Sequence, residues 1–109
     1  MSDWDFDHQK AATAWTIKNL CDRQGLSEGM TINLDLQFEP GEDADRQGFI
    51  RTLGMFGYAV TAPEDEDMVQ AEVEGVAFTL DGIWEHEERC TRIALARGYV
   101  PDGWGFWAP

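Results

Sequence analysis

The sequence predicts an α+β domain: an N-terminal helix followed by the order β-α-β-β-α-β, which is the split βαβ pattern of ferredoxin-like folds with an antiparallel sheet. Apolar and polar residues alternate in segments 31–38 and 69–74, as in half-buried strands, whereas segments 7–23, 42–56 and 80–97 repeat apolar residues at helical spacing. A chain of 109 residues can bury one core. We therefore expect a single domain over residues 1–109, with the extra helix in residues 1–25 and the β-α-β-β-α-β core in residues 30–109.

The first half of the chain predicts one helix and one strand. The helix runs from about Asp7 to Arg23, and Gly25 is a suitable residue to end it. Its expected apolar stripe consists of Ala14, Ile17 and Cys21, flanked by Trp15 and Leu20. In the strand at 31–38 one face is apolar, formed by Ile32, Leu34, Leu36 and Phe38.

The second half predicts two helices and three strands. Helix 42–56 has the inward stripe Phe49, Leu53 and Phe56, and Gly57 is the expected residue after its end. Strand 58–62 and the acidic loop 64–67 precede strand 69–74, and Gly75 marks a bulge or kink. Helix 80–97, capped by Thr79 or Asp81, has the expected inward stripe Ile83, His86, Cys90, Ile93 and Ala94. The last segment, 99–107, predicts a short strand that is interrupted at Pro101 and at Asp102-Gly103.

The charge of the chain is strongly negative. Eight basic residues stand against 21 acidic ones, for a formal net charge of −13. Nucleic-acid phosphates and anionic membranes repel such a chain, whereas a basic partner is attracted to it. The polar face expected of the sheet is acidic rather than aromatic, which also argues against RNA binding; it carries Asn33, Asp35, Gln37, Gln70, Glu72 and Glu74. Solubility alone is an equally good explanation of the charge.

Cellular location is predicted from what the sequence does not contain. No stretch approaches the ~20 apolar residues of a membrane span, and the first seven residues have no basic or apolar region of a signal peptide. We expect a cytoplasmic protein in which Cys21 and Cys90 stay reduced and serve as small buried hydrophobic residues.

Known catalytic and metal-binding patterns are not found. His86 and Cys90 lie one helical turn apart, but a structural zinc site needs four ligands. Cys90 is more consistent with a core residue than with a nucleophile, and the loop 64–67 does not follow the calcium-binding pattern. The glycines follow neither of the common nucleotide-binding patterns. We therefore expect no enzyme, no catalytic residue, no metal and no cofactor; a small enzyme using Glu72, Glu74 or His86 is the least favoured alternative.

The aromatic C-terminal segment is the most distinctive feature of the sequence. Trp104 and Phe106 should share one strand face, with Trp107 on the other. Each tryptophan either closes the core or anchors a partner, because tryptophan is enriched in binding hot spots. The candidate protein-binding residues are therefore acidic or aromatic, namely Glu64, Asp65, Glu66, Asp67, Glu72, Glu74, Asp102, Trp104 and Trp107.

Two motifs resemble those of the regulator of ribonuclease E activity B family. Residues 57–64, Gly-Tyr-Ala-Val-Thr-Ala-Pro-Glu, are similar to the family's Gly-Tyr-x-Val-Thr-x-Pro-Glu, and residues 102–105, Asp-Gly-Trp-Gly, are similar to its Tyr-Asp-Gly-Trp-Gly. Pro101 stands where the family has tyrosine, and the sequence ends at Pro109 without the acidic tail of some members. The resemblance implies a non-catalytic inhibitor that binds ribonuclease E, through a basic segment of that enzyme, and modulates RNA decay in bacteria.

A second class of function stays open on the sequence. Ferredoxin-like domains often bind small molecules at sheet edges or dimer interfaces, so a ligand-binding or sensory domain is the main alternative. The sequence does not decide the oligomeric state, nor where the N-terminal helix docks.

Overall fold

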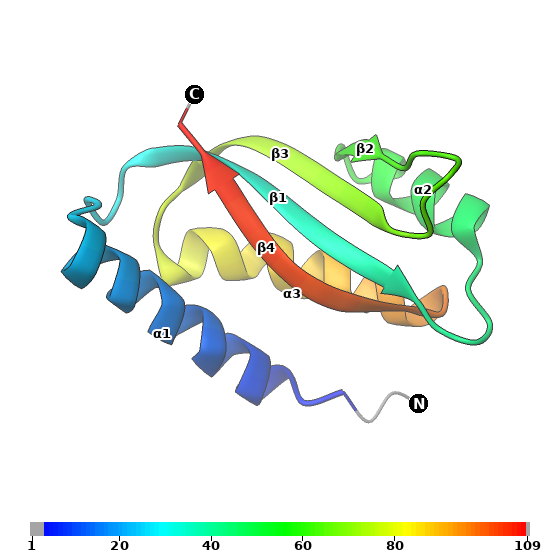
Figure 1. The fold of residues 1–109 in the computed structure, drawn as a ribbon, viewed down its shortest axis with the longest axis horizontal. Coiled ribbons are helices and arrows are strands. Elements are labelled where there is room, and N and C mark those ends of the chain that lie inside the picture. The colour runs from blue at the N-terminus through cyan, green and yellow to red at the C-terminus, as the bar shows by residue number, and fades with distance from the viewer. Residues whose placement is uncertain (1–3, 109) are drawn as a thin grey trace.

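The sheet is antiparallel, with the strand order β2 (Ala59–Thr61), β3 (Val69–Ala77), β1 (Thr31–Pro40) and β4 (Tyr99–Trp107), as expected of a ferredoxin-like α+β fold (Figure 1). The computed structural model describes residues 4–108; residues 1–3 and 109 lie outside this description. Its elements in chain order are α1 (Phe6–Gln24), β1 (Thr31–Pro40), α2 (Arg46–Met55), β2 (Ala59–Thr61), β3 (Val69–Ala77), α3 (Leu80–Ala96) and β4 (Tyr99–Trp107). The predicted fold class and order of elements are thereby confirmed.

The core lies between one face of the sheet and the helices. The predicted apolar face of β1 is buried, because Ile32, Leu34, Leu36 and Phe38 are each at most 2% exposed. Phe49 of α2 packs its ring on Phe38 and Tyr99, with ring centroids 5.2 and 4.7 Å apart. Aromatic pairs at such distances add to the stabilisation from buried area.

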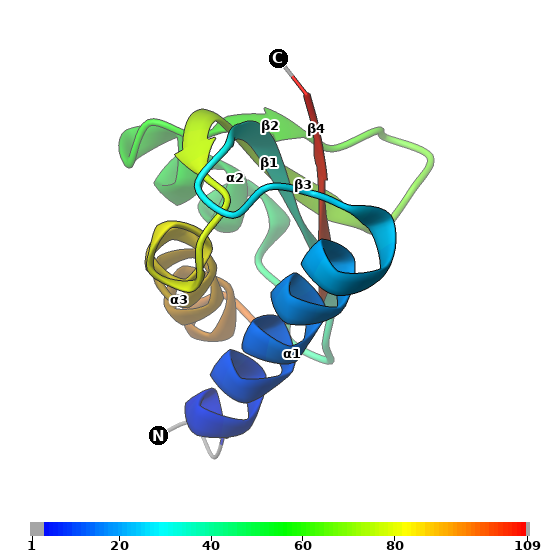
Figure 2. The same cartoon turned by 90° about the vertical axis from the view of Figure 1, so that its left-hand side faces the viewer.

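Helix α1 lies along the β4 edge of the sheet and packs beside α3, rather than across the opposite sheet face (Figures 1 and 2). Ile17 of α1 is 4% exposed and joins the core. Arg92 of α3 lies over the Phe6 ring at 4.3 Å from its centroid, a cation–π contact near the start of α1. Within residues 4–108, the polar face of the sheet is therefore not covered by a helix.

Helix α2 begins four residues later than the sequence predicts. Residues 42–45 form a turn and loop instead, since the Asp45 amide donates to the Arg97 carbonyl at 2.7 Å. The Asp45 side chain then caps the helix by accepting from the Gly48 amide at 3.0 Å. The prediction that Phe56 faces inward is also wrong. Phe56 is the C-cap residue and is 56% exposed, because the chain turns at Gly57, whose φ is 91°.

Strand β4 is continuous, which corrects the prediction of an interrupted strand. It pairs with β1 from Tyr99 to Trp107, and the register shifts once, so that Asp102 is the extra residue of a bulge. Pro101 is tolerated because β4 is an edge strand. The bulge predicted near Gly75 is confirmed by a register shift between β1 and β3.

Helix α3 buries two faces, whereas the sequence predicted one. Ile83, Cys90 and Ala94 face the core as expected, and Thr79 is confirmed as the N-cap, but His86 and Ile93 are only half-buried. The second face was missed and consists of Trp84, Glu87 and Thr91. Two of these residues hydrogen-bond to α1. In α1 itself, the expected flanking residue Trp15 is 66% exposed and Cys21 is half-buried.

We expect Gly98→Ala to destabilise the fold more than Gly25→Ala does. Both glycines have positive φ, 79° and 69°, which costs about 1–2 kcal/mol for alanine. A Cβ at Gly98 would also lie 2.5 Å from the Asp43 carbonyl oxygen, whereas Gly25 has open space. This overpacking adds about 1–3 kcal/mol at Gly98 alone. Urea unfolding followed by circular dichroism measures both variants, and equal losses would contradict the packing of the 41–45 turn on Gly98.

Candidate functional site

Acidic and basic side chains are segregated between the sheet and the helices. All eight basic residues lie in helices or at a helix end: Lys10, Lys18, Arg23, Arg46, Arg51, Arg89, Arg92 and Arg97. The strands carry no lysine or arginine, and outside the helices the one such residue is Arg97, the C-cap of α3. The uncovered face of the sheet therefore has carboxylates with no basic side chain from its own strands, which makes it a negatively charged surface.

The uncovered sheet face contains a hollow of about 400 Å³. Glu72, Glu74 and Trp107 line it, together with Gly57, Ala59 and Val73. Trp107 pairs with Asn33 in the register and is 42% exposed, so it lies on this face as predicted, opposite to Trp104. The Glu72 carboxylate accepts from the Thr61 hydroxyl, which holds it in place, whereas Glu74 is exposed. Three of the predicted site residues thus come together here.

The acidic loop lies away from this hollow. Residues 64–67 are exposed and connect β2 to β3, at the end of the sheet where β4 begins. Arg46 of α2 donates to the carbonyl oxygens of Pro63 and Glu66, at 2.6 and 2.9 Å, and so anchors the loop backbone. The carboxylates of the loop are left to solvent. Asp102 is also exposed at this end, but on the opposite edge of the sheet.

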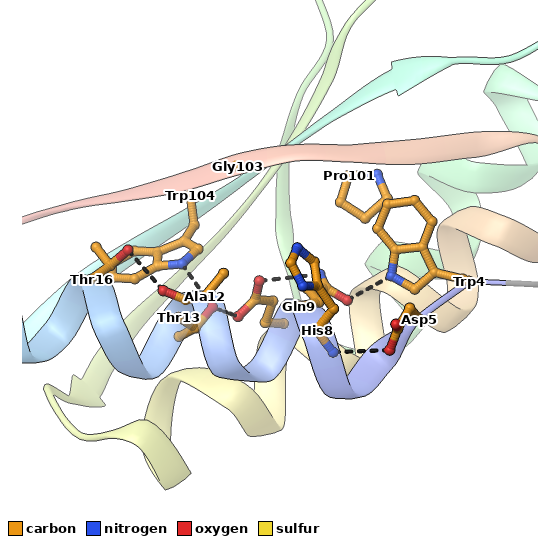
Figure 3. Close-up of a pocket in the computed structure, with 11 residues that line it drawn as sticks. Trp4, Asp5, His8, Gln9, Ala12, Thr13, Thr16, Pro101, Gly103 and Trp104 are labelled. Carbon is orange, nitrogen blue, oxygen red and sulfur yellow. Dashed lines mark hydrogen bonds between the residues drawn. The ribbon is translucent and has the colours of Figure 1, made fainter.

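Trp104 belongs to a second concave site, a groove of about 550 Å³ between α1 and β4 (Figure 3). Trp4 and Trp104 lie at opposite ends of this groove, with His8 between them. Asp5 also lines the groove, near Trp4. Sequence reasoning did not predict this groove, because it forms only when α1 docks beside β4.

The buried carboxylate of Glu87 is at the centre of the contacts between α1, α3 and β4. Glu87 is 6% exposed and lines the groove. It accepts from the Thr13 hydroxyl at 2.6 Å and from the Gln9 amide at 3.1 Å. Gln9 also donates to Thr91 at 3.0 Å, and the Trp104 indole donates to Thr13 at 3.3 Å. Hydrogen bonds are needed here because a buried polar group without a partner is costly.

The carboxylate of Glu87 has hydrogen bonds but no cation beside it. No Lys, Arg or His of residues 4–108 forms an ion pair with it. Burial raises its pKa above the ordinary 4.5, while the hydrogen bonds from Thr13 and Gln9 oppose that rise. One feature of the sequence could have indicated that Glu87 is buried: it lies one helical turn after Ile83, near the apolar stripe of α3.

A separate cluster joins α3 to the start of β2. The Tyr58 hydroxyl accepts from Arg89 at 3.2 Å and is hydrogen-bonded to Nδ1 of His86 at 2.9 Å. Burial lowers the pKa of His86 and raises the pKa of the Cys90 thiol to about 12. Cys90 is fully buried and stays a thiol at neutral pH, so it is a poor nucleophile.

Residues 4–108 show no sign of two other kinds of site. No group of three or more histidine, cysteine, aspartate or glutamate side chains in this range is placed to hold a metal ion. Nor does this range include a helix with the length and hydrophobicity that crossing a membrane requires. The chain matches no protein-family model and shows no significant match to a curated protein.

The stability of the protein will depend on pH through Glu87. Its pKa is raised in the folded state, so the folded state binds this proton more tightly than the unfolded chain does. The resulting stabilisation is complete below the unfolded pKa of 4.5 and is lost as the pH rises through the folded pKa. Glu87→Gln cannot titrate. The free energy of unfolding of the native protein, minus that of the variant, should therefore fall as the pH rises above about 4.5.

Glu85→Gln is the matched control for this pH series, because the Glu85 carboxylate lies on the same helix and its side chain is 62% exposed. Urea unfolding at each pH gives both differences. A native-minus-variant difference for Glu87→Gln that stays constant or rises with pH would contradict the buried position of this carboxylate.

Proposed function

We propose that this protein is a non-catalytic regulator that binds a basic segment of a protein partner through the uncovered acidic face of its sheet. The observation that carries the proposal is the segregation of charge: every lysine and arginine is in or at the end of a helix, and the charged residues of the sheet face are all acidic. Complementary charge speeds encounter with a basic partner and disfavours acidic ones.

The hollow beside Trp107 supports the same proposal. An exposed tryptophan that lines the same hollow as Glu72 and Glu74 combines a large apolar contact with charge-assisted hydrogen bonds to arginine. Arginine also stacks on the face of an indole ring, which gives the hollow a preference for guanidinium over a simple ammonium group.

The resemblance to the regulator of ribonuclease E activity B family suggests ribonuclease E as the partner. Of the two similar motifs, residues 57–64 begin at Gly57, which lines the hollow, and end in the acidic loop. Residues 102–105 lie in β4, whose last residue is Trp107. Inhibition of ribonuclease E, with a resulting effect on RNA decay in the bacterial cytoplasm, is therefore the specific function proposed.

The test is a titration of tagged protein with purified ribonuclease E at low and at high salt. We expect binding at low salt and its loss at high salt, because exposed charges are screened. The double variant Glu72→Gln/Glu74→Gln should weaken binding by about three- to tenfold. Asp22→Asn/Glu28→Gln is the matched control, since it removes two exposed carboxylates from α1 and the loop that follows; it should change binding less.

Two results would contradict the proposal in different ways. Absence of binding at low salt, with a folded protein, means that the family's partner does not apply to this chain. Binding that both double variants weaken equally means that net charge, rather than the sheet face, attracts the enzyme. Ribonuclease activity measured in the same titration then separates inhibition from simple binding.

A further inference from the structure

We infer that the groove between α1 and β4 is a second binding site, which receives the cationic side chains of an extended basic segment of a partner protein. This inference rests on the proposed function, because it adds a site and a binding mode for a basic protein partner. It concerns a different surface from the sheet face, and its failure can be told apart from a failure of that proposal.

The groove combines aromatic walls with carboxylates. Trp4 and Trp104 lie at its two ends, and Asp5 and Glu87 both line it. A guanidinium or ammonium group is attracted to an indole face and to a carboxylate at once. No lysine or arginine of residues 4–108 lines this groove.

The buried carboxylate of Glu87 is an independent observation that points to a cation. It is 6% exposed, lines the groove and has no ion pair within residues 4–108. Its hydrogen bonds from Thr13 and Gln9 fix its position but supply no opposite charge. A cationic side chain in the groove would supply the missing opposite charge, in a place that solvent screens weakly.

The edge of the sheet indicates that the occupant is a polypeptide rather than a free amine. β4 pairs only with β1, so its outer edge carries backbone groups with no neighbouring strand in the described part of the chain. Pro101 and Gly103 of this strand line the groove. Pro101 has no N–H to donate, so the donors to an added strand would come from other residues of β4. An extended segment can hydrogen-bond to such an edge while its alternate side chains enter the groove. A small amine would use the groove alone.

The probe is a fluorescein-labelled nonapeptide of alternating arginine and valine, titrated into the full chain and followed by anisotropy. Ala12→Lys puts a cation on the rim of the groove, and Ala11→Lys puts the same charge on the preceding residue of α1, which does not line the groove. Both alanines are exposed and lysine is a good helix former, so both variants should fold, which circular dichroism verifies.

We expect Ala12→Lys to weaken peptide binding by about tenfold and Ala11→Lys by less than about twofold. The same peptide with N-methyl groups on alternate residues should bind more weakly to the native chain, because it cannot hydrogen-bond to β4. Equal effects of the two lysine variants would overturn the groove as the site, and so would failure of the native chain to bind the peptide. Undiminished binding of the methylated peptide would overturn addition along β4.

Competition identifies the source of the cation. Spermine and free arginine should displace the peptide far less effectively than unlabelled peptide does. If spermine or free arginine binds as tightly as the peptide, and Ala12→Lys weakens the binding of that small molecule, the groove is a site for a small amine and the inference is wrong. If the Ala12→Lys variant binds ribonuclease E as tightly as the native protein does, the groove is not part of the binding site, and the proposed function stands without it. If the native chain does not bind ribonuclease E, that enzyme is not the partner, whether or not the peptide binds in the groove.

Discussion

The hydrogen bonds that α1 donates to the buried carboxylate of Glu87 determine where the two candidate binding surfaces lie. A carboxylate that is 6% exposed on a helix needs hydrogen-bond donors, and α1 supplies them through Thr13 and Gln9. Once these bonds form, α1 lies beside α3 and along the β4 edge (Figure 2). If α1 docked elsewhere, Glu87 would lose its partners, and a buried carboxylate without partners is strongly destabilising.

The position of α1 determines both candidate binding surfaces. Because α1 packs against α3, the polar face of the sheet stays open, and Glu72, Glu74 and Trp107 are accessible there. The same docking creates the groove with Trp4 and Trp104 at its ends. One polar contact between helices thus links the stability of the fold to the two surfaces that bind a basic partner in our account. The raised pKa of Glu87 means that ionisation of this residue weakens the contact.

The sequence predicted the elements well wherever local patterns determine them. The alternation in β1, the cap at Thr79 and the left-handed turn at Gly57 depend on neighbouring residues and match the structure. The predicted start of α2 was wrong because the true start depends on a distant part of the chain. The backbone amide of Asp45 donates a hydrogen bond to the carbonyl of Arg97. The continuity of β4 was missed because Pro101 and Asp102-Gly103 disfavour an inner strand but are tolerated at an edge.

The candidate sites were predictable only in part, for the same reason. Face alternation placed Trp107 opposite to Trp104, and the acidic character of the open face followed from β1 and β3. The groove and Glu87 were not found, because the hydrogen bonds that form them join residues 74 to 91 positions apart. Helical periodicity identifies a stripe that faces the sheet, but it does not reveal a second buried face that is polar.

The docking of α1 is tested most directly by nuclear Overhauser effects to the indole N–H of Trp104. The structure places this indole nitrogen 3.3 Å from the Thr13 hydroxyl oxygen, so we expect strong cross-peaks between the indole proton and the Thr13 side chain. Cross-peaks from α1 to Asp35 or Glu72 on the sheet face, in place of those to Trp104, would contradict the account. They would mean that α1 covers the acidic face and that neither surface exists as described.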